Sequence, residues 1–499
     1  MKSGMRSWAM VALFVAGAAR AEGPAPAKEK MWYDGVTLSV SNRIRGEFVD
    51  WFDPKPGNAP GSAQRYNFMG NQLRFGLRAE SPGAVIFVEG QDTRLVSLPA
   101  NASPPNSKAG NLGPGAVYYA NTHDRDQGET FLKQGYITLR QIPGVPGAAF
   151  TGGRFEYSDG LEVMPTDPAL LWLKRQRIAE RLVGPFGYTH VTRSIDGVKG
   201  TYDTSLFNVT AFGSRPTMGG FEISANRELD IYLAGAAATL KQIQDWAPLD
   251  VRFFYLYYND QRANAVKTDN RVLSPNPANA PKNDKGNIEI STVGAHVVTV
   301  VDVGPGKWDG LLWGAVQGGD WGSQDQFSWG YAVETGYQLP GVFAAPWLRV
   351  GYNRTAGDQD PNDNDHETFF QILPTARIYA QTPFYNMMNS GDLLTELILK
   401  PHPMVMWRTD YHWLQLTSAN DLWYSGGGAT NNNFFGYQGL KVNGRNELAH
   451  FVDTSLTITP IKPLTIYGYY GYAFGQGAVR NLFDGTTGNY GYIEVTMRY

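Results

Sequence analysis

Segments in which apolar and polar residues alternate recur along this chain, and they constrain its fold more than any other feature. Residues 35–52 are the first example, and their apolar parity includes Val36, Leu38, Val40, Ile44 and Phe48. Residues 71–81, 248–259 and 489–499 repeat the pattern. Because successive side chains of a β-strand point to opposite faces of a sheet, each segment predicts a strand with one apolar and one polar face.

The polar faces distinguish a soluble sheet from a membrane barrel. In a soluble, half-buried strand the apolar parity faces a core, whereas in a transmembrane barrel it faces lipid and the polar parity faces a wet lumen. Arginine recurs where we expect the polar parity, at Arg43, Arg45, Arg74, Arg78, Arg140, Arg154 and Arg193. Arginine is almost never fully buried without a partner, so a water-filled lumen accommodates this set better than a soluble core does.

The lengths of the connections support the barrel independently. The alternation predicts 18 strands, at 35–52, 71–81, 83–93, 130–142, 147–157, 190–202, 205–214, 229–241, 248–259, 288–303, 308–321, 326–339, 346–356, 391–400, 403–416, 447–460, 463–475 and 489–499. Short turns such as Ser81-Pro82 and Asp203-Thr204 alternate with most of the long connections, such as 94–129 and 158–189. Short periplasmic turns, long extracellular loops and an even number of strands are typical of bacterial outer-membrane barrels. The predicted fold class is therefore all-β, a single transmembrane antiparallel β-barrel. Aromatic residues beside predicted strand ends are expected in its interface girdles, and they are Trp51, Trp308, Trp321, Trp347 and Trp413.

The N-terminus predicts export. Residues 1–21 combine Lys2 and Arg6, an apolar run from Trp8 to Ala19 and an A-x-A cleavage site, the pattern of a secretory signal peptide. No later segment reaches ~18 uninterrupted apolar residues, the length that a spanning helix needs. We expect one domain, residues 22–499, in the outer membrane of a Gram-negative bacterium.

The sequence gives no sign of an enzyme or a cofactor. The chain contains no cysteine, which excludes a disulfide framework, a thiolate metal site and a cysteine nucleophile. No nucleophile elbow, zinc-protease motif or phosphate-binding loop is present, and His402, His412 and His450 show no metal-ligand spacing. The net charge of −3 does not favour nucleic-acid binding.

One loop is a weak candidate for calcium. Asp358, Asp360, Asp363 and Asp365 supply the hard oxygen ligands that calcium prefers, but the loop lacks the glycine and distal glutamate of an EF-hand. A solvated acidic loop is the favoured alternative. We expect no other metal and no cofactor.

A single segment, residues 168–182, predicts a helix. Thr166 or Asp167 can cap it, with Pro168 in its first turn. It carries four basic residues, Lys174, Arg175, Arg177 and Arg181. It is either a basic helix folded into or over the pore mouth or a solvated loop helix, and the sequence leaves both open.

The charged residues assigned to the lumen are the candidate substrate-binding site. Guanidinium groups stay charged and bind carboxylates bidentately, and rings of Arg or Lys in a pore select anions. The candidate pore-lining set is Arg43, Arg45, Arg74, Arg78, Arg140, Arg154, Glu156, Arg193, Asp196, Arg252, Arg349 and Arg408. Because carboxylates accompany the arginines, the set is also compatible with a wall that neutralises its own charge.

Four segments, in order, resemble the alginate-export family of outer-membrane barrels. They are Gly152-Gly153-Arg154-Phe155-Glu156, Arg193 to Val198, Gly357 to Pro361 with Glu367 to Arg377, and Leu393 to Pro401 with Asp410-Tyr411-His412. The resemblance implies a monomeric barrel whose arginine-rich pore passes an acidic polysaccharide, with Arg154 and Arg193 as matching positions. Phe155 and Ala376-Arg377 depart from the residues common in that family.

The sequence therefore predicts an outer-membrane channel for anions, with export of an acidic exopolysaccharide such as alginate as the leading hypothesis. The alternative is a diffusion porin, either general or specific for organic anions, for the uptake of small molecules. Expected partners are outer-membrane lipid and lipopolysaccharide, the barrel-assembly machinery, the anionic polysaccharide or small anions, and a periplasmic scaffold.

Overall fold

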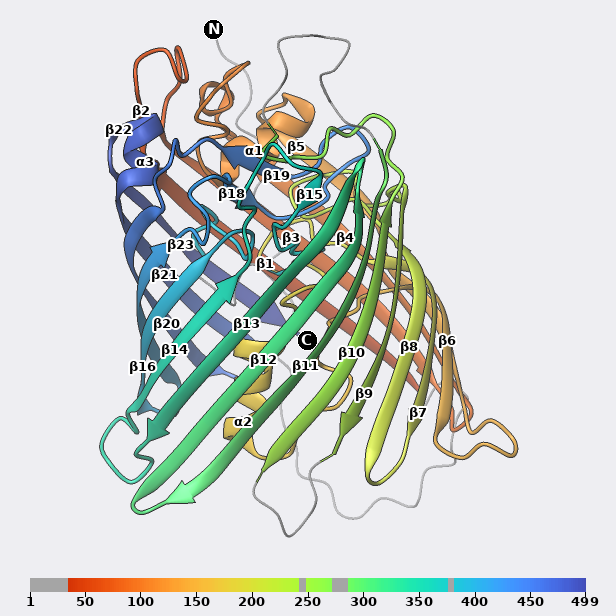
Figure 1. Cartoon of the computed structure of the whole chain (residues 1–499). Coiled ribbons are helices and arrows are strands. Elements are labelled where there is room, and N and C mark those ends of the chain that lie inside the picture. Colours follow the sequence, from red (N-terminus) through yellow and green to blue (C-terminus); the bar gives the residue numbers. More distant parts are fainter. Residues whose placement is uncertain (1–34, 242–247, 272–285, 376–380) are drawn as a thin grey trace, which may run out of the picture.

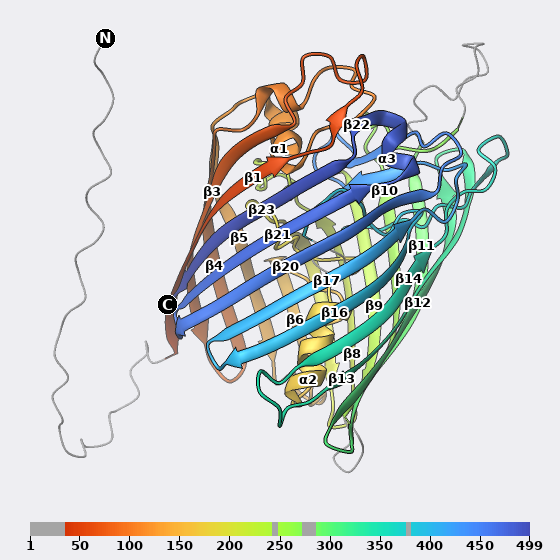
Figure 2. The same ribbon diagram turned by 90° about the vertical axis from the view of Figure 1, so that its left-hand side faces the viewer.

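The computed structural model describes residues 35–241, 248–271, 286–375 and 381–499. These residues form a closed antiparallel barrel of 18 strands (Figures 1 and 2). The predicted signal peptide lies outside the described residues. Within the described ranges, no helix is long and apolar enough to cross a membrane.

Every one of the 18 predicted strands is present. They are β1 (Val36–Asp50), β3 (Arg65–Glu80), β4 (Ala84–Val96), β5 (Gln127–Arg140), β6 (Ala148–Phe155), β7 (Ile195–Asp203), β8 (Phe207–Pro216), β9 (Ile231–Leu240), β10 (Leu249–Asp260), β11 (Ile288–Val303), β12 (Gly306–Trp321), β13 (Gln324–Gln338), β14 (Trp347–Thr355), β16 (Gly391–His402), β17 (Val405–Gln415), β20 (Glu447–Ile461), β21 (Leu464–Gly475) and β23 (Thr487–Arg498). The first strand closes the barrel, because β1 pairs with β3 on one side and with β23 on the other. Closure leaves no exposed sheet edge.

Short helices and strands lie in the connections between the barrel strands. They are β2 (Asp53–Pro54), η1 (Ala100–Ala102), α1 (Pro114–Thr122), α2 (Pro168–Leu173), the π-turn η2 (Lys174–Ile178), β15 (Asp365–His366), β18 (Trp423–Gly426), β19 (Tyr437–Leu440), α3 (Gly477–Leu482) and β22 (Phe483–Gly485). Short turns join the strands at one end and most long loops lie at the other, as predicted (Figure 1). In barrels of this class the end with short turns is periplasmic.

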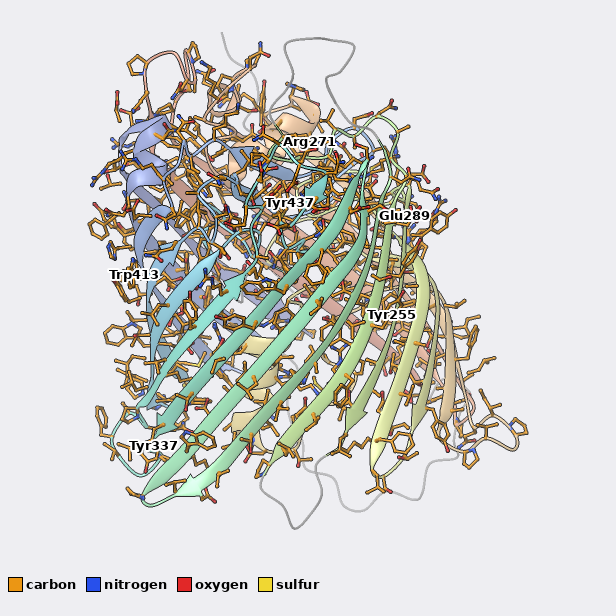
Figure 3. The ribbon with its side chains drawn as sticks, in the orientation of Figure 1. Tyr255, Arg271, Glu289, Tyr337, Trp413 and Tyr437 are labelled. Atoms are coloured by element: carbon orange, nitrogen blue, oxygen red, sulfur yellow. The ribbon has the colours of Figure 1, made fainter. Side chains whose placement is uncertain are left out.

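The alternation places apolar side chains outside and polar ones inside. Leu38 on β1 is 75% exposed on the outer face, whereas Arg45 and Glu47 on the same strand are buried in the lumen. Figure 3 shows Tyr255 and Trp413 on the outer wall, where both are exposed. The exterior is therefore the lipid-facing surface that the sequence predicts.

The aromatic residues next to strand ends divide between the two faces. Trp308 and Trp413 are exposed outside, as interface aromatics should be. Trp51, Trp321 and Trp347 are buried inside instead, so the prediction that these three belong to the interface girdle is wrong. Each packs against the loops that fill the barrel: Trp347, for example, lies 4.8 Å from the ring of Trp172.

Long loops fold inward and fill the barrel rather than standing clear of it. The β6–β7 connection, residues 156–194, and the described residues of the β14–β16 connection, 356–375 and 381–390, meet through backbone hydrogen bonds in the lumen. Leu373 donates to the carbonyl of Leu182 at 2.7 Å, and Gly184 donates to that of Leu373 at 2.8 Å. Buried aromatic side chains from these loops and from residues 416–446 form an apolar core inside the wall.

Candidate functional site

A polar cavity of about 750 Å³ lies between the barrel wall and the inward-folded β6–β7 loop. It reaches the end with short turns, because Ser39 near the start of β1 and Tyr499 at the chain terminus both line it. Five arginines and four glutamates line it: Arg43, Arg45, Arg74, Arg408 and Arg498, with Glu89, Glu156, Glu180 and Glu494. Its aromatic lining consists of Trp172, Tyr188, Tyr467, Tyr492 and Tyr499. The cavity thus presents guanidinium donors together with flat aromatic faces.

Two arginines of β1 join the wall to the loop. Arg45 donates to Glu494 through Nε and Nη2, at 2.9 and 2.7 Å, and to the carbonyl of Tyr188 at 2.9 Å. Arg43 donates to the carbonyls of Gly187, at 2.7 Å, and Thr189. The carboxylate of Glu494 lies 3.8 Å from Nε of Arg43. Arg43 is therefore held mainly by neutral carbonyl groups, and its positive charge is only partly balanced.

Arg74 belongs to a second group of charges in the same cavity. Its Nη1 lies 3.2 Å from Glu156 and 3.5 Å from Glu89. Lys133 shares Glu156, at 3.1 Å from its Nζ. Because Arg74 and Lys133 share Glu156 and Glu89 remains only weakly engaged, this group resembles an exchangeable network more than a set of fixed pairs.

The predicted basic helix begins where the sequence indicates and ends earlier. Asp167 caps α2, accepting hydrogen bonds from the backbone of Ala169 and Leu170, both at 2.9 Å. The helix gives way to the π-turn η2 and stops at Ala179 rather than at residue 182, because the chain then turns to meet the β14–β16 loop. Figures 1 and 2 place α2 inside the barrel, near the end with short turns.

Buried ion pairs anchor this helix to the wall. Lys174 lies 2.5 Å from Asp250 on β10. Arg177 binds Glu334 on β13 through two nitrogens, both at 2.8 Å, and Arg181 approaches the same carboxylate at 3.3 Å. Of the two alternatives that the sequence leaves open, the structure places the basic segment within the barrel rather than in solvent.

Three further predicted arginines face the lumen, each beside carboxylates. Arg252 contacts Asp159 at 2.5 Å and Glu162 at 2.8 Å. The other two, Arg349 and Arg408, share Glu396 at 3.0 and 2.7 Å. Much of the inner wall is therefore a self-neutralising network, the alternative that the sequence also allows.

Arg154 and Asp196 do not line the lumen, and this corrects the prediction. Arg140 on β5 faces inward and pairs with Ala149 on β6, so the inward residues of β6 are the odd-numbered ones. Arg154 therefore faces outward, where it binds Asp196 at 2.6 and 2.5 Å. Val198, which shares the parity of Asp196 on β7, is exposed on the outer surface. The hairpin register, which residue types alone do not reveal, places this pair outside.

Arg78 and Arg140 occupy inward positions at the rim of the short-turn end. Both contact Glu80, at 2.9 and 2.8 Å, and all three side chains are more than one-third exposed. They lie at the entrance of the lumen rather than in its interior. Their pairs lie in water and contribute little to stability.

Arg193 is buried without a carboxylate partner. It precedes β7 instead of lying in the predicted strand 190–202, which begins only at Ile195. Its Nη2 donates to the carbonyl of Gly427 at 3.4 Å, and its guanidinium lies 5.5 Å from the ring of Phe186. Its Nε and Nη1 have no hydrogen-bond partner among the described residues. Arg193 is thus an unbalanced positive charge between the inward loops.

The candidate calcium loop is only partly buried. Asp358 is buried and close to Asp421, and burial followed by that carboxylate raises the pKa of Asp358 to about 7. Burial also raises the pKa of Asp421 to about 6. Asp360, Asp363 and Asp365 are exposed, and the first two accept hydrogen bonds from nearby backbone groups. Calcium binding by this loop stays a prediction.

Three acidic side chains of the inner wall are site residues that sequence reasoning missed. Glu334, Glu396 and Asp309 share the inward parity of their strands with the arginines they bind. The same alternation that identifies the arginines could have identified these carboxylates. The loop partner of Glu334, however, depends on the fold of a long loop, and the partner that Asp309 and Glu396 share, Arg349 on β14, depends on the strand register.

A family model described as alginate export matches residues 36–477. Among solved structures, the chain is similar to a BenF-like porin from Pseudomonas fluorescens Pf-5, with a TM-score of 0.58 at 7% identity over 94% of this chain and 99% of that one. It is also similar to OpdK from Pseudomonas aeruginosa, solved with vanillate, with a TM-score of 0.54 at 8% identity over 93% and 98%. OccK8 (OprE) of Pseudomonas aeruginosa gives a TM-score of 0.53 at 11% identity over 94% and 99%. No curated protein sequence matches. At these identities the solved structures establish the fold alone, which is that of outer-membrane channels.

Proposed function

The chain belongs to the alginate-export family, and on that premise we propose that this outer-membrane channel exports an acidic polysaccharide. The polymer enters through the cavity at the end with short turns. The observation that carries the proposal is the lining of that cavity, where five arginines outnumber four glutamates beside five aromatic rings. Arginine binds carboxylates bidentately, and apolar ring faces pack against sugar rings.

The ion pairs of the lining favour transport of the polymer over tight binding of it. A uronate that enters must compete with Glu156 and Glu89 for Arg74, so each sugar is held weakly and can move on. Arg43 adds positive charge to the lining that neighbouring carboxylates do not closely balance. A carboxylate bound by such groups is attracted without being trapped.

Passage requires the inward loops to move. The β6–β7 and β14–β16 loops are hydrogen-bonded to each other and packed on buried apolar side chains inside the barrel. A polymer chain has a width of several ångströms, so it needs these loops displaced along its path. We propose that the loops form a gate that is closed in this structure and opens on contact with polymer or with a periplasmic partner.

A charge reversal in the cavity, with a matched control on the outer wall, tests the assignment. The barrel is reconstituted in planar bilayers, and block of its ion current by an oligouronate is measured for Arg74→Glu and for Arg154→Glu. We expect Arg74→Glu to weaken block at least tenfold, because one favourable charge contact worth about 1.4 kcal/mol or more is reversed. Arg154→Glu, which makes the same change on the outward face, should leave block within twofold of wild type. Equal effects of the two variants would contradict the assignment.

The second candidate function is uptake of small organic anions. It is favoured by the fold shared with porins, one of which was solved with vanillate, an aromatic carboxylate. A cavity of 750 Å³ is also large enough for such a molecule. Block by a monomeric aromatic carboxylate at concentrations where the oligouronate has no effect would favour this alternative over polymer export.

A further inference from the structure

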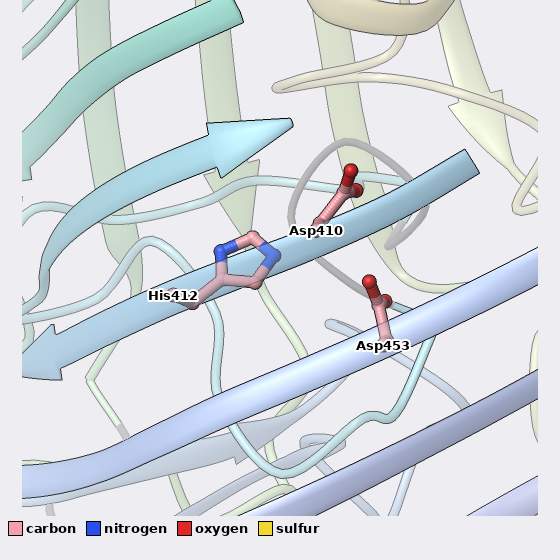
Figure 4. Close-up of side chains that lie close together, drawn as sticks. All are labelled: Asp410, His412 and Asp453. Carbon is pink, nitrogen blue, oxygen red and sulfur yellow. The ribbon is translucent and has the colours of Figure 1, made fainter. Parts of the chain in front are cut away.

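Three inward side chains on neighbouring strands meet in the barrel wall: Asp410 and His412 on β17, and Asp453 on β20 (Figure 4). All three are buried, and one ligand atom from each lies within 4.8 Å of the others. Asp410 and Asp453 are direct partners in the register of the two strands. Like charges directly opposite each other destabilise an antiparallel pair, so this pair would gain from a cation that both carboxylates share.

Each carboxylate of the group has one oxygen held by a neighbour. Arg408 lies 2.5 Å from Oδ2 of Asp410, and the hydroxyl of Tyr469 donates to Oδ2 of Asp453 at 2.7 Å. Oδ1 of Asp410 and Nε2 of His412 are buried and have no hydrogen-bond partner among the described residues. Figure 4 shows the His412 ring with a nitrogen turned towards the two carboxylates. The unpartnered atoms therefore point at a common space.

A fourth carboxylate orients the imidazole. Asp392 on β16 lies 2.9 and 3.0 Å from Nδ1 of His412 through its two oxygens, and Phe451 packs against the ring at 5.7 Å. When Nδ1 carries the proton and donates it to Asp392, the lone pair of Nε2 is directed at Asp410 and Asp453. A carboxylate bound behind a histidine in this way is the usual outer shell of a histidine that ligates a metal.

We propose that Asp410, His412 and Asp453 bind a divalent transition-metal ion of the Zn²⁺ class. One imidazole nitrogen and two carboxylate oxygens supply three ligands of a tetrahedral site, and the fourth position faces the lumen. Ligands about 2.1 Å from a tetrahedral Zn²⁺ lie about 3.4 Å apart, so the three side chains close in slightly around the ion. The ion converts the repulsion between Asp410 and Asp453 into attraction through a shared cation.

The donor set favours Zn²⁺ over the hard cations. Calcium prefers six to eight oxygen ligands, and magnesium prefers an octahedral shell of oxygens, whereas imidazole suits zinc. The competing account is a protonated His412 that neutralises the carboxylates without any metal. A protonated ring would carry a hydrogen on Nε2 beside two buried acceptors, yet Nε2 makes no hydrogen bond with a described residue. A metal ion bound to Nε2 of His412 would explain why this nitrogen has no hydrogen-bond partner among the described residues.

Titration of the refolded, chelator-treated barrel with Zn²⁺ by isothermal calorimetry tests the proposal. We expect one Zn²⁺ per barrel and binding at least tenfold tighter than that of Ca²⁺. His412→Gln and Asp453→Asn each remove a ligand and should weaken Zn²⁺ binding at least tenfold. Asp392→Asn, which changes only the group behind the histidine, should weaken it about 10- to 100-fold. The matched control is His296→Gln, another buried histidine bonded to an aspartate, Asp250, at 2.6 Å, and it should bind Zn²⁺ as wild type does.

Wild-type protein alone can also overturn the proposal, so the test does not depend on folded variants. X-ray absorption of the Zn²⁺-loaded wild-type barrel should show the multiple scattering of one imidazole and light ligands at about 2.0–2.2 Å. Absence of Zn²⁺ binding, a zinc shell without imidazole, preference for Ca²⁺ or unchanged binding in folded His412→Gln would each overturn it.

Discussion

Removing the carboxylate of Glu334 should release the inward β6–β7 loop from the barrel wall. This side chain is fully buried on β13 and accepts two hydrogen bonds from Arg177 at 2.8 Å, with Arg181 3.3 Å away. Arg349 of the wall lies 3.2 Å from it and keeps Asp309 and Glu396 as partners when the charge is removed. Glu334→Gln preserves the shape and removes the charge. Breaking a buried ion pair by neutralising one partner costs about 3–5 kcal/mol, because the remaining charge stays buried. At about 1.4 kcal/mol per factor of ten, docking of the loop weakens by two to nearly four orders of magnitude.

Two measurements report the release. The chain contains no cysteine, so a single Leu173→Cys substitution, at a buried position of α2, gives a clean thiol probe. We expect thiol labelling to be at least 100-fold faster in the Glu334→Gln background, and the open fraction of single channels in planar bilayers to rise. Glu289→Gln is the control, because Glu289 lies on the outward parity of β11 (Figure 3) and should change neither readout. Folded Glu334→Gln protein with wild-type labelling and gating would refute the anchoring role.

Two further predictions concern the loops and the outer wall. Asp358 and Asp421 have folded pKa values raised to about 7 and about 6, so the folded loop binds protons that the unfolded loop does not, and its stability falls as pH rises from about 4 to 7. The hydrogen-exchange protection factors of residues 357–365, each normalised to the intrinsic exchange rate at that pH, should therefore be larger at pH 5 than at pH 8, and if the loop binds calcium, Ca²⁺ should restore protection at pH 8. Smaller protection factors at pH 5 would contradict the burial argument. Val293, which is 61% exposed on β11, faces lipid, so Val293→Arg should destabilise the barrel by about 2–4 kcal/mol in a urea titration in lipid vesicles, and an unchanged midpoint would contradict the assigned face.

The sequence predicted the barrel because the strand signal is local. Period-two alternation depends only on neighbouring residues, and it identified all 18 strands and the inward face of β1 and β10. The cap at Asp167 is equally local and correctly marked the start of α2. Both features require no knowledge of which strands or loops meet.

The errors arose where distant residues decide the outcome. A bulge interrupts the register of β4 and β5 near Lys133, and the register of the next hairpin turns Arg154 outward. The position of Trp347 near a strand end suggests the outer girdle, but that position does not show whether the side chain points to the lipid or to the lumen. Arg177 binds Glu334, which lies 157 residues further along the chain. No local sequence pattern predicts such a pairing.

The group around His412 shows the same limit. Asp410 and His412 share a face of one strand, which alternation alone predicts, but Asp453 and Asp392 come from strands on either side. Ligand spacing in sequence therefore cannot reveal the cluster. Knowledge of the strand register is needed before the four side chains appear together.

The ion selectivity of the wild-type channel tests the central claim most directly. The reversal potential is measured in planar bilayers across a tenfold KCl gradient, with oligouronate absent. An excess of arginine over glutamate in the cavity, together with the unpaired Arg193, predicts preference for chloride over potassium. A reversal potential of the opposite sign, showing preference for potassium, would contradict an anion pathway for either polymer export or organic-anion uptake.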